Sequence, residues 1–268
     1  MAGVDQRPAQ YGYQPDARQD GTGYRLKDRP ASDILKTRVL KPLASLVPGS
    51  VVIDLGSGDG NFVHKAGGNR PYDILAVDLE PSAIRSVNKL FASQRRRGRE
   101  NHDTAVVGDI SRLSEISELD GTVDAAVSWR VLHGIPQGLH APTFNQVYEK
   151  LKPGGSFYIA VASERDWKVG ALGDGYRPGE TNDCSGVMFR DHGVGREHEF
   201  PILFYSQDRL AELAQRTGFV VGGVELFEEP SGYAHLKDGK PNTYLFAELK
   251  KPDEDISPNG SHHRRGSH

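Results

Sequence analysis

The stretch "VVIDLGSGDGNF", residues 51–62, decides the fold of this chain. Apolar and β-branched residues, typical of a strand, lead to Asp54, and glycine then takes every second position at Gly56, Gly58 and Gly60. Glycine lets the backbone adopt positive φ angles and approach a ligand closely, and a helix that follows points its free N–H groups at that ligand. The stretch therefore predicts a nucleotide-like binding turn at the carboxyl end of a first strand.

Strands and helices alternate along the chain around this turn. We expect strands at 51–55, 73–78, 104–107, 123–128 and 156–162, and helices at about 31–46, 60–67, 81–94 and 143–151. Continuous apolar runs such as "ILAV" suit strands buried on both faces, and the alternation is typical of βαβ units with a parallel sheet. A helix capped by Ser206 and stopped by Gly218 follows, and two strands at about 219–226 and 242–249 close the chain. The pattern predicts a doubly wound α/β fold.

Three segments depart from this alternation. Residues 1–29 are polar and rich in glycine, proline and glutamine, which predicts a flexible N-terminal segment and a candidate lid. The domain itself is expected over 30–251, and its residues 163–205, rich in glycine and charge, are expected to form a cap insertion over the pocket. Residues 252–268 have no apolar periodicity and are predicted to be a disordered tail.

Composition limits the class of protein. A chain of 268 residues with 37% hydrophobic residues can build one α/β domain, and its net charge of -3 offers no basic field for nucleic acid or an anionic membrane. No apolar run is long enough to span a bilayer, and the N-terminus lacks an apolar signal region. The single cysteine, Cys184, cannot form an intrachain disulfide. We expect a cytoplasmic monomer or homodimer that binds neither nucleic acid nor membrane.

The acidic residues at three strand ends describe a ligand. Asp54 would repel a pyrophosphate but attract an ammonium group. Asp78 ends the second strand, where an acid can accept both ribose hydroxyls, and Gly108 and Asp109 of "VVGDI" end the third, where they can meet an adenine edge. A ligand with adenine, ribose and a cationic amino-acid part, without phosphate, fits S-adenosylmethionine.

Five segments resemble, in the family order, the motifs of the class I S-adenosylmethionine-dependent methyltransferases. They are "VVIDLGSGDG", "LAVDLEPSAI", "VVGDI", "VDAAVSWRVLHGIP" and "LKPGGSFYIAVAS", and the resemblance covers about residues 30–250. It implies a Rossmann-like, seven-stranded sheet whose last strand is antiparallel, with a lid insertion before strand six. It also implies contacts to the cofactor from Asp54, Gly56, Ser57, Gly58, Asn61, Asp78, Leu79, Gly108, Asp109, Ile110 and Ser128.

Plainer interpretations of the same residues stay open. The glycines could form only a tight turn, and Asp78 could merely cap the helix whose first turn holds Pro81. Asp109 could be the N-cap of a helix that starts near Ser111.

The reaction needs little from the protein beyond positioning. A methyl sulfonium is already electrophilic, so the enzyme must hold a nucleophile in line and exclude water, and it needs a base only if the acceptor arrives protonated. In "SWRVLHGIP", above the end of strand four, Arg130 could clamp an acceptor carboxylate and His133 could take a proton. The two would share a face if this turn is helical. Alternatively, Arg130 pairs with a neighbouring carboxylate and His133 packs over the cofactor.

Residues that could contact the acceptor come from several segments. They are Tyr24, Trp129, Tyr176, Arg190 and His192, although Trp129 could instead cover the adenine or the core. The segment 191–198, "DHGVGREH", lacks the tight spacing of a metal site, so no metal is expected.

These observations favour a methyltransferase that acts on an oxygen or nitrogen of a small molecule. The "SWRVLHGIP" stretch lacks the Asn or Asp, two prolines and aromatic residue of enzymes that methylate amino groups of nucleic acids. One alternative is a protein or peptide methyltransferase, and another is a methyltransferase-like protein that binds the cofactor without transferring its methyl group. An NAD-linked oxidoreductase is disfavoured by Asp54 before the glycines and by "KPGG" at 152–155.

Overall fold

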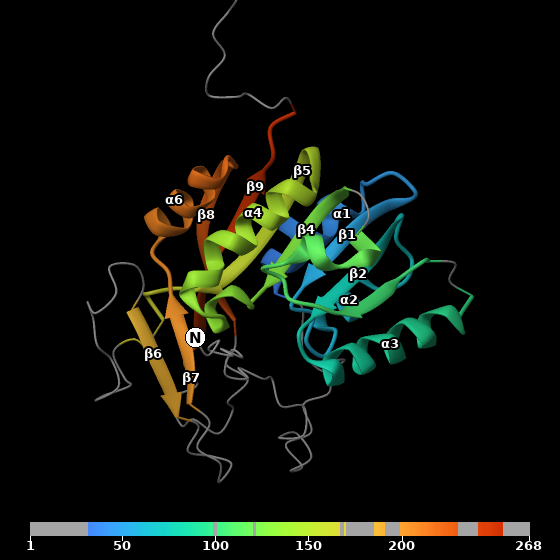
Figure 1. Cartoon of the computed structure of the whole chain (residues 1–268), viewed down its shortest axis with the longest axis horizontal. Helices are drawn as coiled ribbons and strands as arrows, with labels where there is room; N and C mark the ends of the chain where they lie inside the picture. The colour runs from blue at the N-terminus through green and yellow to red at the C-terminus, as the bar shows by residue number, and fades with distance from the viewer. Residues whose placement is uncertain are drawn as a thin grey trace, which may run out of the picture.

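The computed structural model describes residues 32–98, 101–119, 122–166, 169, 185–190, 199–229 and 241–253, and of 185–190 and 199–202 it describes the backbone alone. Its centre is a seven-stranded sheet with the order β3-β2-β1-β4-β5-β9-β8 (Figure 1). The strands are β1 Ser50–Leu55, β2 Tyr72–Asp78, β3 Thr104–Val107, β4 Val123–Trp129, β5 Leu151–Ala162, β8 Val220–Glu229 and β9 Asn242–Lys250.

The pairing of these strands confirms the expected fold. Strands β1 to β5 are parallel to one another, whereas β9 lies between β5 and β8 and is antiparallel to both. The last strand of the chain is thus the antiparallel one in a Rossmann-like, doubly wound α/β fold. Because β1 to β4 run parallel, the residues that end them gather at one edge of the sheet, the carboxyl edge.

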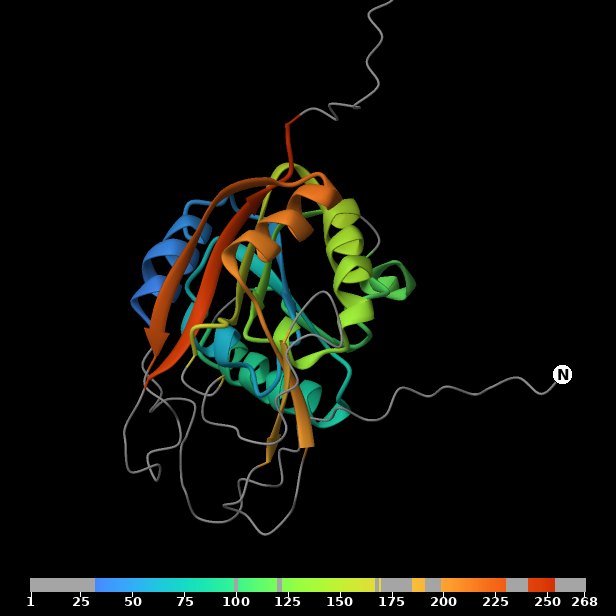
Figure 2. The same ribbon diagram turned by 90° about the vertical axis from the view of Figure 1, so that its left-hand side faces the viewer.

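Helices cover both faces of the sheet (Figures 1 and 2). One face is covered by α4 His140–Lys150 and α6 Gln207–Thr217, with the 3₁₀ helices η4 Leu113–Glu115 and η5 Ser117–Leu119. The other is covered by η3 Leu35–Leu40, α1 Lys41–Leu43, α2 Asn61–Ala66 and α3 Pro81–Arg95. Two further 3₁₀ helices, η6 Leu132–Gly134 and η7 Gln137–Leu139, lie between β4 and α4.

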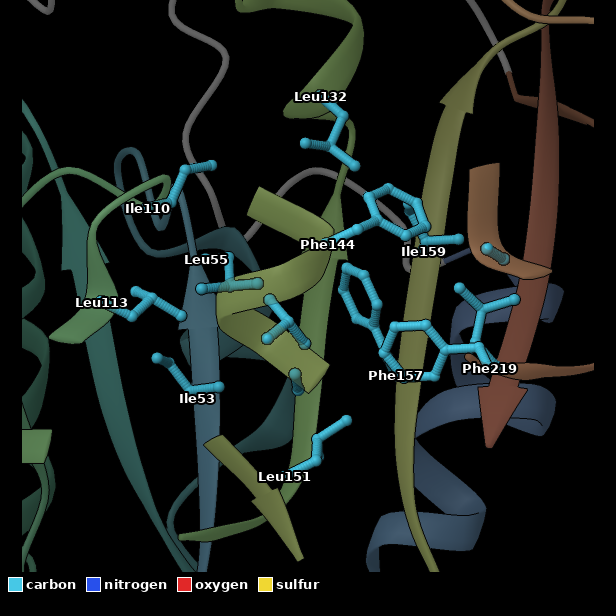
Figure 3. Close-up of a cluster of buried hydrophobic side chains, with 14 of the residues drawn as sticks. Ile53, Leu55, Ile110, Leu113, Leu132, Phe144, Leu151, Phe157, Ile159 and Phe219 are labelled. Atoms are coloured by element: carbon cyan, nitrogen blue, oxygen red, sulfur yellow. The ribbon is translucent and has the colours of Figure 1, made fainter. Parts of the chain in front are cut away.

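Side chains alternate between two cores because successive residues of a strand point to opposite faces. In β5, Phe157 and Ile159 enter the core beneath α4 and α6, while Tyr158 and Ala160 enter the opposite one. Figure 3 shows the first core, where the rings of Phe144 and Phe157 meet edge to face with centroids 5.5 Å apart. Such pairs add roughly 0.5–1.5 kcal/mol to the free energy of unfolding beyond the burial of their area.

The first helix is shorter than the sequence predicts. Helical structure runs from Asp33 to Leu43 rather than over 31–46, and its middle, η3, has the wider π spacing. Pro42 has no N–H to donate to the carbonyl one turn before it, and its ring crowds that carbonyl. The π turn lies directly before this proline, where a wider turn relieves the crowding.

The insertion contains a hairpin that its composition does not predict. Strands β6 Ser185–Arg190 and β7 Glu199–Phe204 pair antiparallel in a sheet of their own. The backbone of Ser163, just after β5, pairs with that of Tyr205, just after β7, so the insertion leaves and rejoins the fold at the carboxyl edge. Its role as a lid stays a prediction. Among the described residues, no helix combines the length and apolar character needed to cross a membrane.

Candidate active site

The glycine turn has the left-handed backbone that its sequence predicts. The φ angles are 68° at Gly56, 52° at Gly58 and 86° at Gly60. A Cβ at Gly56 would lie 2.4 Å from Cγ1 of Val131, whereas a Cβ at Gly58 would meet no atom within 4 Å. Packing therefore requires glycine at position 56, and position 58 borders open space at the carboxyl edge.

Asp78 joins the turn to the second strand. Its Oδ2 accepts a hydrogen bond from the Gly58 N–H at 2.7 Å, and its Oδ1 accepts one from the Glu80 N–H at 2.9 Å. Burial raises the pKa of Asp78, and the two N–H groups oppose this rise because they stabilise the carboxylate. Asp78 thus orders the start of α3, as in the plainer interpretation, and also holds the glycine turn.

Asp54 is a buried carboxyl group with no ion pair to any residue that the structure describes. It lies one residue before the end of β1 and is 2% exposed, and its Oδ2 makes no hydrogen bond to the described residues. Burial, and to a lesser extent repulsion from Asp78, raises the pKa of Asp54 to about 8. Such a group is costly to bury alone and would be stabilised by a cation bound beside it.

Three more buried polar atoms near Asp54 lack a partner. They are Ser57 Oγ in the turn, Asn61 Oδ1 at the start of α2, and Ser128 Oγ near the end of β4. With Asp54 they account for four of the seven such side-chain atoms in the described part of the chain. Since buried polar groups are nearly always hydrogen-bonded, these four atoms indicate a polar ligand at the carboxyl edge. Such a ligand matches the amino-acid part of S-adenosylmethionine.

The ends of β2 and β3 present both apolar and polar groups. Leu79 and Val107 are 57% and 52% exposed, unusual for large apolar side chains and suited to the face of an adenine ring. Ile110, by contrast, is buried in the core beneath α4. Oδ1 of Asp109 accepts hydrogen bonds from the N–H and hydroxyl of Ser111, at 2.8 and 2.7 Å. Asp109 thus holds a local turn with Ser111, but it is not the N-cap of a helix, because the next helical residues are those of η4, whose N-cap is Arg112.

Gly108 connects the second and third strand ends. Its N–H donates to the Asp78 carbonyl at 3.0 Å, and a Cβ at this position would lie 2.7 Å from Cδ1 of Ile116. The absence of a side chain thus lets the end of β3 lie close to the end of β2.

Arg130 pairs with a carboxylate of the fold. The residue is not helical, since its φ is 65°, and it does not share a helical face with His133. Its Nη1 donates to Glu229 Oε2 at 3.0 Å, and its guanidinium lies 5.7 Å from the centre of the Tyr244 ring. Burial lowers the pKa of Arg130, but Tyr244 and Glu229 outweigh it and hold the pKa above its usual value. The second interpretation of Arg130, in which it pairs with a carboxylate of the protein, is therefore the arrangement observed.

His133 faces the end of β5. Its Nδ1 accepts a hydrogen bond from the Ala162 N–H at 3.3 Å, and its ring centroid lies 6.2 Å from that of Tyr244. In this arrangement the unprotonated ring nitrogen, the one that a base would use, points to the backbone. The geometry therefore favours the second interpretation, a residue that shapes the pocket.

The predicted acceptor contacts fall in different places. Trp129 is 9% exposed and packs between Phe227 and Phe246, at centroid distances of 5.7 and 6.4 Å, so the structure gives it a place in the core. Arg190 ends β6, where the backbone alone is described. Tyr24, Tyr176 and His192 lie outside the described residues. Within the described ranges, no cluster of histidine, cysteine and acidic residues could hold a metal ion.

Sequence reasoning missed Glu229 and Tyr244. Both lie at strand ends, where polar residues are common, and Glu229 is 99 residues from Arg130 in the chain. Strand order alone could have suggested them, because β9 lies beside β5 and β8 lies beside β9, so that Tyr244, near the start of β9, and Glu229, at the end of β8, reach the edge where β4 ends.

Comparison with known proteins gives the family. Residues 26–222 match the family described as a methyltransferase domain. Among solved structures, a SAM-dependent methyltransferase from Methanosarcina mazei has a TM-score of 0.60 and 20% identity, covering 78% of this chain and 95% of that one. A glycopeptide N-methyltransferase in complex with S-adenosylhomocysteine has a TM-score of 0.54 and 19% identity, covering 83% and 91% of the two chains.

A third structure is of a protein described in connection with the conversion of a disulfide bond into a thioacetal group during echinomycin biosynthesis. It has a TM-score of 0.55 and 18% identity, covering 86% of this chain and 88% of that one. At these identities the solved structures show a common fold. Comparison with curated protein sequences found no match. The family match covers most of the chain, and the fold agrees with it. The chain therefore belongs to the methyltransferase domain family and is a class I S-adenosylmethionine-dependent methyltransferase.

Proposed function

We propose that the protein transfers the methyl group of S-adenosylmethionine to an oxygen or nitrogen of a small-molecule acceptor. The observation that carries this proposal is the group of buried, unpartnered polar atoms of Asp54, Ser57, Asn61 and Ser128 at the carboxyl edge. They lie where a class I methyltransferase needs polar partners for its cofactor.

Different residues at the carboxyl edge would bind different parts of the cofactor. Asp54 would bind the ammonium group, and Asp78 would accept the ribose hydroxyls, because each of its oxygens uses one lone pair for an N–H group and keeps another. The exposed side chains of Leu79 and Val107 would cover the adenine ring. S-adenosylmethionine supplies an electrophilic methyl group, so no further group of the protein is required to activate it.

Positioning is the main contribution of the protein to the rate. Glu229 neutralises Arg130, and the Nδ1 atom of His133 accepts a hydrogen bond from the Ala162 N–H. Neither arrangement provides a ready base, and holding the acceptor in line while excluding water can supply most of the acceleration. His133 and Arg130 would then shape the acceptor side of the pocket.

A small acceptor is favoured by the position of the insertion. Residues 163–205 start and end at the carboxyl edge, at the paired backbones of Ser163 and Tyr205, where a cap would restrict the size of the acceptor. The net charge of -3 also disfavours a nucleic-acid acceptor. The domain limits of 30–251, a cytoplasmic location and a monomeric or homodimeric state remain predictions from the sequence.

Calorimetry with S-adenosylhomocysteine tests the cofactor site. We expect binding in the micromolar range or tighter for the wild type, and a large loss of affinity for Asp54→Asn. The variant Asp33→Asn, at an exposed position before η3, is the matched control and should bind like the wild type. A wild-type protein that binds neither S-adenosylhomocysteine nor S-adenosylmethionine would contradict the proposal.

A transfer assay with labelled S-adenosylmethionine tests the acceptor class. We expect transfer to members of a panel of small phenols, alcohols and amines. Transfer to peptides alone would support the peptide methyltransferase instead, and binding without transfer to any acceptor would support a cofactor-binding protein.

A further inference from the structure

Two buried aromatic side chains near the carboxyl edge of the sheet form a hydrogen-bonded pair. His140, the first residue of α4, is 3% exposed, and Tyr205, which follows β7, is fully buried. The Tyr205 hydroxyl contacts His140 Nδ1, and His140 Nε2 lies 3.1 Å from the carbonyl oxygen of Ile135. The two rings stack with their centroids 5.6 Å apart.

These contacts assign the protons. The Ile135 carbonyl can only accept, so His140 Nε2 carries a proton and donates it. Burial lowers the pKa of His140, which keeps the ring neutral, so that Nδ1 accepts the proton of the Tyr205 hydroxyl. The direction of each bond is therefore set. A phenylalanine at position 140 would remove both bonds, and one at position 205 would remove the bond between the two rings.

The pair belongs to a longer chain of hydrogen bonds that reaches His133. The Tyr205 N–H donates to the Ala162 carbonyl at 2.9 Å, and the Ala162 N–H donates to His133 Nδ1 at 3.3 Å. On the other side, His140 is bonded to Ile135, two residues after His133. The loop of residues 132–135 is thus held from both sides by one connected set of bonds.

We infer that His140 and Tyr205 form a positioning clamp, which fixes the loop of residues 132–135 and the orientation and tautomer of the His133 ring against the returning end of the insertion. The inference deepens the proposed function and rests on it in one respect, namely that this loop borders the acceptor. The chain returns from the insertion at Tyr205, so the same hydroxyl ties the insertion, α4 and the loop together.

The polar pair is better suited to positioning than to general core stability. Burying a hydroxyl and an imidazole gives little net stability even when both are bonded, whereas their bonds are directional. Two phenylalanines would fill a similar volume but would leave the loop free to shift along the ring faces.

Three substitutions separate the parts of the clamp. Tyr205→Phe removes only the hydroxyl, and His140→Phe keeps an aromatic ring but removes both of its bonds. His140→Gln keeps one donor and one acceptor, so it should restore part of the clamp. Tyr158→Phe removes a hydroxyl from a tyrosine that is 3% exposed and lies in the opposite core, and it serves as the control.

Amide hydrogen exchange and imidazole ¹⁵N NMR read out the loop without any acceptor. In Tyr205→Phe, loss of the hydrogen bond to His140 should speed amide exchange in residues 132–135 by about tenfold. Exchange rates in strands β1 and β2 should not change. The His133 ring nitrogens, held with Nδ1 unprotonated in the wild type, should move toward a mixture of tautomers. His140→Phe should show both changes, His140→Gln smaller ones, and Tyr158→Phe neither, while affinity for S-adenosylhomocysteine stays within about twofold of the wild type.

The outcomes distinguish this inference from the proposed function. Wild-type exchange and His133 signals in Tyr205→Phe would overturn the clamp, and so would an equal loss of protection in every strand, which indicates a general core role. A wild-type protein that fails to bind S-adenosylhomocysteine would overturn the proposed function, yet the exchange and NMR results would still decide on the clamp.

Discussion

At the scale of single residues, the site depends on one carboxyl group buried without a cation. With the pKa of Asp54 at about 8, the group is protonated in the free protein at neutral pH. An ammonium group bound beside it favours the carboxylate, so binding of S-adenosylmethionine should release a proton below pH 8.

The affinity for S-adenosylhomocysteine should therefore rise with pH from about 6 to 8, and fall again as the ligand loses its ammonium proton at about pH 8 or above. Calorimetry in buffers of different ionisation enthalpy measures the released proton. Asp54→Asn should bind weakly and release none, and a wild-type affinity that does not vary with pH over this range would contradict the assignment.

The same group should make the stability of the free protein depend on pH. The pKa of Asp54 is higher in the folded than in the unfolded state, so the folded state binds more protons between about pH 4 and 8. The contribution of Asp54 to the free energy of unfolding is thus present at low pH and is lost as the pH rises through this window. The Tm of ligand-free Asp54→Asn should exceed that of the wild type by a margin that widens from pH 5 to pH 8. A constant margin in thermal melts would show that the carboxyl group ionises normally.

Two glycines of one turn should respond differently to alanine. Both have positive φ, which costs roughly 1–2 kcal/mol for a residue with a Cβ. Gly56→Ala adds a collision with Val131 and should lower the free energy of unfolding well beyond that cost. Gly58→Ala meets open space, so the fold should tolerate it while the methyl group obstructs the cofactor. Denaturant unfolding and calorimetry on both variants measure the difference, and similar stabilities would refute the packing argument.

At the scale of elements, strand ends are tied together by side chains from distant parts of the chain. Arg130, after β4, bonds Glu229 at the end of β8 and lies over Tyr244 of β9. The Arg130 and Glu229 side chains are 28% and 14% exposed, so the pair is only partly screened by water.

Glu229→Gln should consequently destabilise the protein by about 1–3 kcal/mol, because it removes the carboxylate that is hydrogen-bonded to the Arg130 guanidinium and leaves only the weaker attraction of Asp59. Asp33→Asn removes the carboxylate of an exposed pair with Lys36 and should cost less than about 1 kcal/mol. Chemical denaturation compares the two variants. If Glu229→Gln lowered the free energy of unfolding as little as Asp33→Asn does, water would be compensating the charge of Arg130 in place of Glu229.

Capping shows how well elements follow from local sequence. Ser206 Oγ accepts from the Arg209 N–H at 3.2 Å, and Gly218 ends α6 with a φ of 103°, as predicted for both residues. The β6–β7 hairpin was not predicted, since its segment has the glycine and charge content of a loop and its pairing lies within the insertion.

At the scale of the whole molecule, Leu35 is the first described residue with a side chain buried in the core. Leu35, Val39 and Leu43 are at most 1% exposed and pack against the sheet. Each fully buried side chain of this kind contributes roughly 1.5–3 kcal/mol, a large share of the 5–15 kcal/mol that stabilises a typical domain.

Deleting residues 1–23 should accordingly leave Tm nearly unchanged and reduce turnover, because that segment carries Tyr11 and Tyr13 but little else that is apolar. Deleting residues 1–46 should prevent folding. Circular dichroism melts and the transfer assay measure the two effects. Full turnover after the shorter deletion would exclude a role for the segment in catalysis.

Much of the fold and of the local geometry around the glycine turn could be predicted from the sequence, because the chemistry involved is local. Positive φ at Gly56 to Gly60, the cap at Ser206 and the acids that end β1 and β2 each depend on a few neighbouring residues. Other features exist only in the folded chain. The pairing of Arg130 with Glu229, the contact of His140 with Tyr205 and the core position of Trp129 join segments 65 to 99 residues apart or rest on strands that meet in the sheet. Strand order decides the first and the third, because β9 and then β8 follow β5 in the sheet and bring Glu229 and the aromatic partners of Trp129 near the end of β4. The return of the chain from the insertion to the end of β5 decides the second, because it places Tyr205 beside α4.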